Sequence, residues 1–166
     1  EVYFDMALTM LDEIMKNNAA GKRTVMIVPV GPTDQYPILA RLVNQLNVSL
    51  KNVWFFNMDE YMTTETDKIA PEHPMSFEGR MYREFYSRIN PELVMPKEQR
   101  LFPIPGKEAE YDALIEKLGG VDLGEYDLLD LHVKPSVIQW SCSHCRKTSP
   151  GKCRFPADTA GAGCKR

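Results

Sequence analysis

The sequence predicts an α/β protein with a doubly wound, mainly parallel sheet. Two short apolar runs, Thr24 to Val30 and Asn52 to Phe56, have the β-branched and aromatic content that is typical of buried strands. Segments with apolar residues at helical spacing lie before, between and after these runs. Because strands that alternate with helices along a chain usually pair in parallel, this order indicates a Rossmann-like sheet with helices on its faces.

The first third of the chain predicts a helix, a strand and a second helix. The first helix ends at the polar stretch Asn17 to Gly21, and its apolar positions are Tyr3, Ala7, Met10, Leu11 and Ile14. The strand Thr24 to Val30 is apolar throughout, as a sheet covered on both faces requires. The turn 31–34 leads into the second helix, whose apolar positions are Ile38, Leu39, Leu42 and Val43.

The segment after the second strand predicts two more helices. Ser76 is expected to cap a helix that continues to Ile89, with Phe77, Met81 and Phe85 on one face. Short extended pieces are expected at 93–95 and 101–102, and another helix at 108–118, where two glycines end it. A further strand should begin near Val121, although the segment 121–133 is more polar than a central parallel strand should be.

Length and composition fit one globular domain of ordinary size. The chain has 166 residues, of which 43% are hydrophobic and 26% are charged, the composition of a soluble protein. The net charge of −3 gives no electrostatic reason to expect a nucleic acid or a membrane as partner. No apolar run approaches the roughly 20 residues of a membrane span, and the acidic start does not resemble a signal peptide, so we expect a cytoplasmic protein. Because the sequence opens on Glu1 without an initiator Met, we expect a fragment or a processed product.

A pair of carboxylates directly follows the second strand, in the segment Asn57-Met58-Asp59-Glu60-Tyr61. In open α/β sheets, ligands bind in the crevice outside the carboxyl ends of the strands. Asp59 and Glu60 are therefore the candidate catalytic residues, since a carboxylate there can act as a general base on a small polar substrate. The alternative is structural, because either carboxylate could instead cap the next segment.

The turn after the first strand is a candidate phosphate site. Gly31, Pro32 and Thr33 stand between a predicted strand and a predicted helix, where backbone N–H groups and the helix dipole can hold a phosphate. Pro32 removes one of those donors, and Asp34 adds a negative charge that should weaken binding. Since strand-turn-helix junctions with glycine are common, the turn alone does not specify its ligand.

Four segments, taken in order and spacing, resemble one known family. They are Ile27 to Thr33 (Ile-Val-Pro-Val-Gly-Pro-Thr), Val48 to Val53, Phe56 to Tyr61 (Phe-Asn-Met-Asp-Glu-Tyr) and Glu72 to Phe77 (Glu-His-Pro-Met-Ser-Phe). The resemblance is to the N-terminal half of the glucosamine-6-phosphate deaminase (isomerase) family. The 6-phosphogluconolactonases share the fold, but the Asn-Met-Asp-Glu-Tyr and His-Pro-x-Ser pieces favour the deaminases.

The resemblance implies an enzyme of amino-sugar phosphate metabolism. The family converts glucosamine 6-phosphate to fructose 6-phosphate and ammonia, with no metal or organic cofactor. Asp59 matches the carboxylate that moves a proton between C2 and C1, which gives an enolamine that then loses ammonia. Gly31 and Thr33 match the turn that contacts the substrate near its phosphate. The implied partner is a small-molecule sugar phosphate, and the resemblance allows a homo-oligomer for a complete family member.

The chain also departs from the family pattern. The turn 31–33 reads Gly-Pro-Thr where the family usually has Gly-Gly-Thr or Gly-Ser-Thr. An Asp/Asn-Gly-His-Ile-Ala-Phe-Asn-Glu-Pro segment, which supplies the ring-opening histidine, does not occur in frame, nor do the later Arg and Lys residues that grip the phosphate. Whether the chain is an enzyme is therefore left open. We expect this chain alone to have little or no catalytic activity, and a non-catalytic sugar-phosphate-binding remnant is the alternative. His73 is expected to order the loop before Ser76 rather than to act in catalysis.

The end of the chain differs in composition from the rest. All four cysteines, Cys142, Cys145, Cys153 and Cys164, lie there among Lys, Arg, Gly and Pro residues. Codons can be chosen for Gln139 to His144 that encode Asn-Gly-His-Val-Ala when they are read one base later, which is close to the missing motif. We therefore expect residues 1–131 to form a partial, incomplete α/β domain and residues 132–166 to be a frameshifted, unstructured tail. The alternative is a zinc-binding tail built on the Cys142-x2-Cys145 pair.

Overall fold

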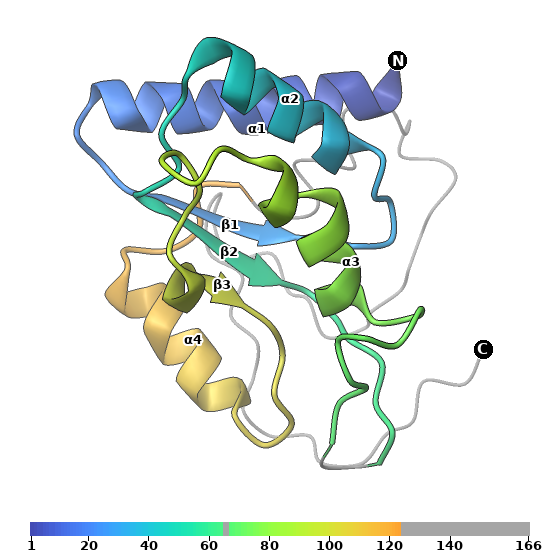
Figure 1. Cartoon of the computed structure of the whole chain (residues 1–166). Helices are drawn as coiled ribbons and strands as arrows, with labels where there is room; N and C mark the ends of the chain where they lie inside the picture. Colours follow the sequence, from blue (N-terminus) through green and yellow to red (C-terminus); the bar gives the residue numbers. More distant parts are fainter. Residues whose placement is uncertain (65–66, 124–166) are drawn as a thin grey trace, which may run out of the picture.

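The computed structural model of the protein describes residues 1–64 and 67–123 (Figure 1). Helices and strands alternate along this part of the chain, as the sequence predicts. In chain order they are α1 (Val2–Ala19), β1 (Thr24–Val28), α2 (Gln35–Leu46), β2 (Val53–Asn57), α3 (Phe77–Glu84), β3 (Arg100–Leu101) and α4 (Glu108–Lys117), with short 3-10 helices at Tyr86–Arg88 and Lys97–Gln99.

The three strands form a parallel sheet in the order β1-β2-β3. β1 and β2 pair along their full length, from Thr24 opposite Val53 to Val28 opposite Asn57. β3 is short and pairs with the second half of β2. The predicted α/β class with a parallel sheet is confirmed.

The strand order reverses at β1. On the edge of β1 that faces away from β2, the Ile27 N–H donates to the Leu123 oxygen at 3.0 Å, and the Asp122 N–H donates to the Val25 oxygen at 2.8 Å. Leu123 also forms a parallel bridge with Met26. After α4 the chain has therefore returned to the far side of β1. Such a reversal is the topological switch point at which doubly wound sheets bind their ligands.

Helices cover the two faces of the sheet unequally (Figure 1). The helices α1, α2 and α3 contribute to one core with Met26, Val28 and Phe55, all of them buried. Because successive residues of a strand point to opposite faces, Phe56 faces the other side, where Tyr111 of α4 meets it edge-on with ring centroids 4.9 Å apart. No residue of α4 is buried, so this second layer covers less of the sheet than the first.

The third helix is shorter than predicted. The sequence predicts a helix from Ser76 to Ile89, whereas α3 ends at Glu84 and a 3-10 turn follows. Phe85 leaves the helical conformation, with φ −128° and ψ −72°. Its ring stacks on Phe55 with centroids 5.5 Å apart. Packing of this aromatic ring in the core outweighs continuation of the helix.

The strand ends differ from the prediction by one or two residues. β1 stops at Val28 rather than at Val30, because Pro29 has no N–H with which to continue the ladder. β2 continues one residue further than predicted, to Asn57. The polar Asn57 is nevertheless buried at the strand end.

Several expectations fall outside the described residues. The tail 132–166 with its cysteines, and all of the strand expected beyond Leu123, lie there. In the two described ranges, no helix is long and apolar enough to cross a membrane. The same ranges hold no group of three or more His, Cys, Asp or Glu side chains arranged to bind a metal ion. The frameshifted tail and the zinc alternative therefore stay predictions.

Gly79 allows the loop before α3 to pack against the helix. A Cβ on this residue would stand 1.9 Å from the carbonyl oxygen of Pro71, which is a backbone atom. We expect Gly79→Ala to lower the free energy of unfolding by about 1–3 kcal/mol through overpacking, although alanine has the better helix propensity. Denaturant unfolding of the full chain measures the change.

Gly31→Ala is the matched control for this substitution. No atom lies within 4 Å of a Cβ built on Gly31, so we expect a change of no more than about 0.5 kcal/mol. An equal loss of stability in both variants would contradict the packing argument.

Candidate active site at the carboxyl edge of the sheet

The carboxyl ends of β1 and β2 lie side by side. Val28 pairs with Asn57, and the Met58 N–H donates to the Val28 carbonyl oxygen at 3.1 Å. Both strands run in the same direction, so the turn 31–33 and the segment 58–61 leave the sheet at the same edge. The structure therefore brings both groups of predicted site residues to the edge beside the reversal of strand order.

The turn after β1 is held from the interior by the first residues of α2. The Tyr36 hydroxyl donates to the Pro29 carbonyl oxygen, and the Tyr36 N–H donates to the Thr33 oxygen at 3.1 Å. The Gln35 side-chain amide donates to the Pro32 oxygen at 2.8 Å. Gln35 and Tyr36 are both fully buried. These bonds satisfy carbonyl groups of the turn and hold it from within the protein.

Gly31 is exposed, and its surroundings do not require a glycine. Its φ lies outside the left-handed region, and no atom stands close to the position of a Cβ. A glycine with open space around it leaves its backbone accessible to the close approach of a ligand. Asp34 occupies the N-cap position of α2 without a side-chain cap bond, so its charge remains next to this turn.

Asn57 fixes the other side of the site by joining the ends of two strands. Its side-chain amide donates to the Leu101 carbonyl oxygen at 2.8 Å. The hydroxyl of Tyr111, a residue of α4, donates to the backbone carbonyl oxygen of Asn57 at 2.6 Å and lies 3.2 Å from the backbone carbonyl oxygen of Leu101. Burial raises the pKa of Tyr111, so its hydroxyl stays protonated and remains a donor at neutral pH.

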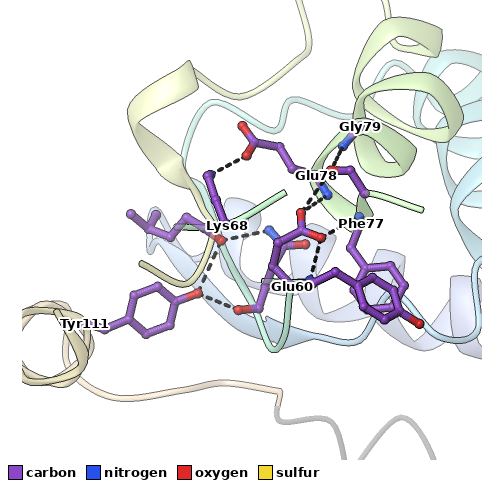
Figure 2. A network of polar contacts seen from close by, with 10 residues as sticks. Glu60, Lys68, Phe77, Glu78, Gly79 and Tyr111 are labelled. Carbon is purple, nitrogen blue, oxygen red and sulfur yellow. Dashed lines mark hydrogen bonds and ion pairs between the residues drawn. The ribbon is translucent and has the colours of Figure 1, made fainter. Parts of the chain in front are cut away.

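Glu60 caps α3 together with Ser76 (Figure 2). Its Oε1 accepts from the Phe77 N–H at 2.9 Å, and its Oε2 accepts from the Glu78 N–H at 2.8 Å and from the Ser76 hydroxyl at 3.1 Å. Ser76 is the N-cap residue, as predicted, and its Oγ accepts from the Gly79 N–H at 3.1 Å. The first N–H groups of a helix have no acceptor within the helix. The side chains of Glu60 and Ser76 supply acceptors for these groups in α3. The capping role that the sequence left open for the two carboxylates belongs to Glu60.

The loop between Glu60 and α3 folds back on itself and is attached to the helix. The Ile69 N–H donates to the Tyr61 oxygen at 2.8 Å. Lys68 forms an ion pair with Glu78 (Figure 2). The rings of Tyr61 and Phe77 pack with centroids 5.0 Å apart. The segment that follows Asp59 is thus tied to α3 at several points.

Asp59 itself is exposed at this edge. Partial loss of surrounding water, followed by the negative charge of Glu60, raises the pKa of Asp59 above its ordinary value, while a backbone hydrogen bond opposes the rise. A carboxylate whose pKa is raised toward neutral pH binds a proton more strongly, which suits a general base. The arrangement can therefore remove a proton from a substrate held at the edge of the sheet.

His73 orders the loop before α3, as predicted. Its Nδ1 accepts from the Met75 N–H at 3.2 Å. The backbone N–H of His73 donates to the Ala70 carbonyl oxygen at 3.0 Å, and the backbone carbonyl oxygen of His73 accepts from the Ser76 N–H at 3.0 Å. These local bonds shape the turn that presents Ser76 to the helix.

Three residues that support the site were missed by the sequence analysis, namely Gln35, Tyr36 and Tyr111. Tyr111 reaches Asn57 across 54 positions of the chain, which no local pattern reveals. For Tyr36 a signal exists, because a tyrosine at the start of an amphipathic helix brings a hydroxyl that needs a partner when buried.

Comparison with known proteins connects this chain to one group of enzymes. It is 36% identical over 111 residues to a glucosamine-6-phosphate deaminase of Parabacteroides distasonis, a match over 64% of this chain and 39% of that protein. Deaminases of the same name from Thermoanaerobacter sp. strain X514 (32% over 122 residues, 67% and 44% of the two chains) and Phocaeicola vulgatus (34% over 116 residues, 65% and 42%) are also similar. The chain spans about two fifths of the length of these curated relatives.

The fold has a counterpart among solved structures. A monomeric glucosamine-6-phosphate deaminase superimposes with a TM-score of 0.58 at 24% sequence identity, over 74% of this chain and 48% of that one. At this identity the likeness concerns the fold, and it agrees with the α/β architecture described above. No protein-family model matches the chain.

The raised pKa of Asp59 predicts a pH-dependent cost in stability. Because the folded-state pKa lies above the unfolded value, ionising Asp59 is harder in the folded protein, and stability falls as pH rises through the window above the ordinary carboxyl pKa. We therefore expect Asp59→Asn to raise the melting temperature at neutral pH. The gain should vanish near about pH 3, where the carboxyl group is protonated in both states.

Thermal unfolding of both proteins across this pH range checks the expectation. Asp12→Asn, at an exposed position of α1, controls for the loss of one negative charge. A lower melting temperature of Asp59→Asn at neutral pH, with no change in the control, would contradict the sign of the effect.

Proposed function

Since this chain is related by sequence to the N-terminal half of the glucosamine-6-phosphate deaminases, we propose that it acts in amino-sugar phosphate metabolism and binds a sugar phosphate at the carboxyl edge of its sheet. In this proposal Asp59 is the base, and the turn Gly31 to Thr33 lies next to the phosphate. The reaction is the conversion of glucosamine 6-phosphate to fructose 6-phosphate and ammonia.

The observation that carries the proposal is the common edge of the two exit segments. The pairing of Val28 with Asn57 puts the Gly31 turn and the Asp59 loop on neighbouring strands. The strand order reverses at β1, the strand that precedes the turn, and ligands of doubly wound sheets bind at such a reversal. A phosphate at the turn and a reacting carbon at the carboxylate would then belong to one small molecule.

The chemistry requires a base that acts on two neighbouring carbons. In the open-chain form of glucosamine 6-phosphate, C1 is an aldehyde and C2 carries the amine and an acidic proton. Asp59 removes the C2 proton while the C1 oxygen takes up a proton, which gives an enolamine. The proton held by Asp59 is then delivered to C1, which leaves an imine at C2. Water then adds at C2, ammonia leaves, and fructose 6-phosphate results. Proton transfer by one positioned carboxylate serves both steps and calls for no metal or organic cofactor.

The setting of the proposed reaction follows from the same relationship. We place it in the cytoplasm, where phosphorylated sugars are handled, and a complete protein of this kind could assemble as a homo-oligomer. The ring-opening histidine motif and the later phosphate-binding cations do not occur in frame in this sequence, so we expect the activity of this chain alone to be impaired. The described part would supply the base and the turn.

A substrate labelled with deuterium at C2 tests the role of Asp59 directly. We expect the full chain to bind glucosamine 6-phosphate and to remove the label from C2, after which the label appears in water or at C1, because this loss needs only the first proton transfer. Asp59→Asn should bind the sugar phosphate but lose label release by at least about a hundredfold, the contribution typical of a general base. Asp12→Asn is the matched control.

Three measurements separate the outcomes of this experiment. Calorimetry reports binding, NMR reports label loss, and an enzymatic assay reports ammonia. Binding without label loss would support the alternative of a non-catalytic sugar-phosphate-binding module. Absence of both binding and label loss in the folded full chain would refute the proposed function.

The charge of Asp34 predicts an unusually weak phosphate site. Asp34 stands at the N-cap position of α2, directly after the turn, and Pro32 offers no N–H there. Two like charges a few ångström apart in water repel each other by about 0.5–1 kcal/mol, so we expect Asp34→Asn to tighten binding of glucosamine 6-phosphate by about two- to fivefold. The gain should shrink at high salt, and binding of unphosphorylated glucosamine should not change. An equal gain for both sugars would place the phosphate elsewhere.

A further inference from the structure

The geometry points to Glu60 as a positioning residue: its carboxylate ties the segment that carries Asp59 to the N-terminus of α3, and thereby sets the direction and the charge environment of the Asp59 side chain (Figure 2). The sequence pattern suggests a different task, that of a second catalytic carboxylate beside Asp59. The inference rests on the proposed function, in which Asp59 is the base.

Both oxygens of Glu60 are occupied by donors of its own chain. Oε1 accepts from the N–H groups of Tyr61 and Phe77, each at 2.9 Å. Oε2 accepts from the Glu78 N–H at 2.8 Å and from the Ser76 hydroxyl at 3.1 Å. A carboxylate has about four acceptor positions, so these four bonds use its capacity. A proton-transfer role would require an oxygen within hydrogen-bond reach of the substrate, and Glu60 could offer one only by giving up a cap bond.

The helix that Glu60 caps depends on its cap. α3 has eight residues, and a helix of this length is not stable by itself in water. Bonds from backbone N–H groups to a charged carboxylate are stronger than neutral hydrogen bonds, and the negative charge is favoured at the positive end of the helix dipole. The link between Glu60 and the first turn of α3 is therefore a strong attachment point for the loop.

Asp59 stands between two fixed neighbours. On one side, the side chain of Asn57 is bonded to Leu101, and its carbonyl group is bonded to Tyr111. On the other side, Glu60 is bonded to α3. Met58, the residue between Asn57 and Asp59, donates its N–H to β1. A catalytic group must be held within about 0.5 Å of its productive geometry, and these attachments restrict the backbone on both sides of Asp59.

Glu60 also contributes to the electric field at Asp59. Its charge raises the pKa of Asp59, after the larger effect of burial. On the helix that Glu60 caps, Glu78 is paired with Lys68. Tyr36 of α2, which interacts electrostatically with Asp59, stays neutral because burial raises its pKa. Removing the charge of Glu60 should therefore lower the pKa of Asp59, whereas a residue with a purely mechanical role would leave it unchanged.

The test compares Glu60→Gln with the wild-type full chain by NMR. Glutamine keeps the length of the side chain and one acceptor oxygen, but it loses the charge and half of the cap. We expect the carboxyl resonance of Asp59 to titrate at a lower pH. The amides of Phe77 and Glu78 should lose hydrogen-exchange protection by about fivefold, the effect typical of a lost helix cap.

Glu84→Gln is the matched control on the same helix. The Glu84 carboxylate pairs with Arg88 beyond the far end of α3 and takes no part in the N-terminal cap. We expect this variant to leave both the Asp59 titration and the protection of Phe77 and Glu78 unchanged. Equal effects in the two variants, or no effect in Glu60→Gln, would overturn the inference.

A measurement on the unmodified chain keeps the inference testable if Glu60→Gln does not fold. The amides of Phe77 and Glu78 should exchange with solvent several times more slowly than unprotected amides, because the Glu60 carboxylate is their acceptor. Exchange of these two amides at the unprotected rate would show that the cap is absent in solution and would overturn the inference.

The NMR readouts need no substrate, so they test the role of Glu60 independently of the proposed function. With the deuterium-labelled sugar phosphate, Glu60→Gln should slow label release by about tenfold or more, since small displacements of a catalytic group are costly, and its pH–rate profile should shift to lower pH. Label release at the wild-type rate in Glu60→Gln would overturn the positioning role and leave the proposed function standing. A lowered Asp59 pKa in a chain that never releases label would uphold the link between the two carboxylates and refute the function of Asp59 as the base.

Discussion

The hydrogen-bonded register between β1 and β2, with Val28 opposite Asn57, determines where everything at the carboxyl edge lies. Parallel strands end at the same edge, so the turn after β1 and the loop after β2 become neighbours although they are far apart in the chain. At Leu123 the chain returns to the side of β1 that faces away from β2, so the strand order reverses at β1. The turn and the loop therefore lie next to this reversal. A slip of one residue in this register would turn Asn57 out of the interior and separate the exits.

The edge is supported by three helices rather than by one element. Tyr36 holds the turn from α2, Tyr111 holds the strand ends from α4, and α3 holds the loop through Glu60. Each support uses backbone groups that would otherwise be left without partners at strand and helix ends, where unpaired polar groups are costly when buried. The hydrogen bonds that satisfy these backbone groups therefore also fix the shape of the site.

Asp59, the base in the proposed reaction, carries an energetic cost in the folded protein. Asp59 lies next to a like charge in partly desolvated surroundings, which disfavours its ionised form in the folded protein. The N-terminus of α3 stabilises the charge of Glu60, the neighbour that adds to the larger cost of burial. The two adjacent acidic residues therefore differ in their surroundings. The carboxylate of Glu60 is hydrogen-bonded to the N-terminus of α3, whereas Asp59 has a raised proton affinity.

The sequence by itself determined the α/β class, the order of helices and strands, the Ser76 cap and the location of the carboxylate pair after a strand. These features arise from periodicity, propensity and capping, which act within a few residues of the chain. Only the tertiary structure decided that α3 ends at Glu84, where Phe85 leaves the helix to pack on Phe55, and that Glu60 caps a helix 17 residues further along. Both outcomes depend on contacts between distant segments, whose strength is set by burial and geometry in the folded state, and local sequence carries no record of either.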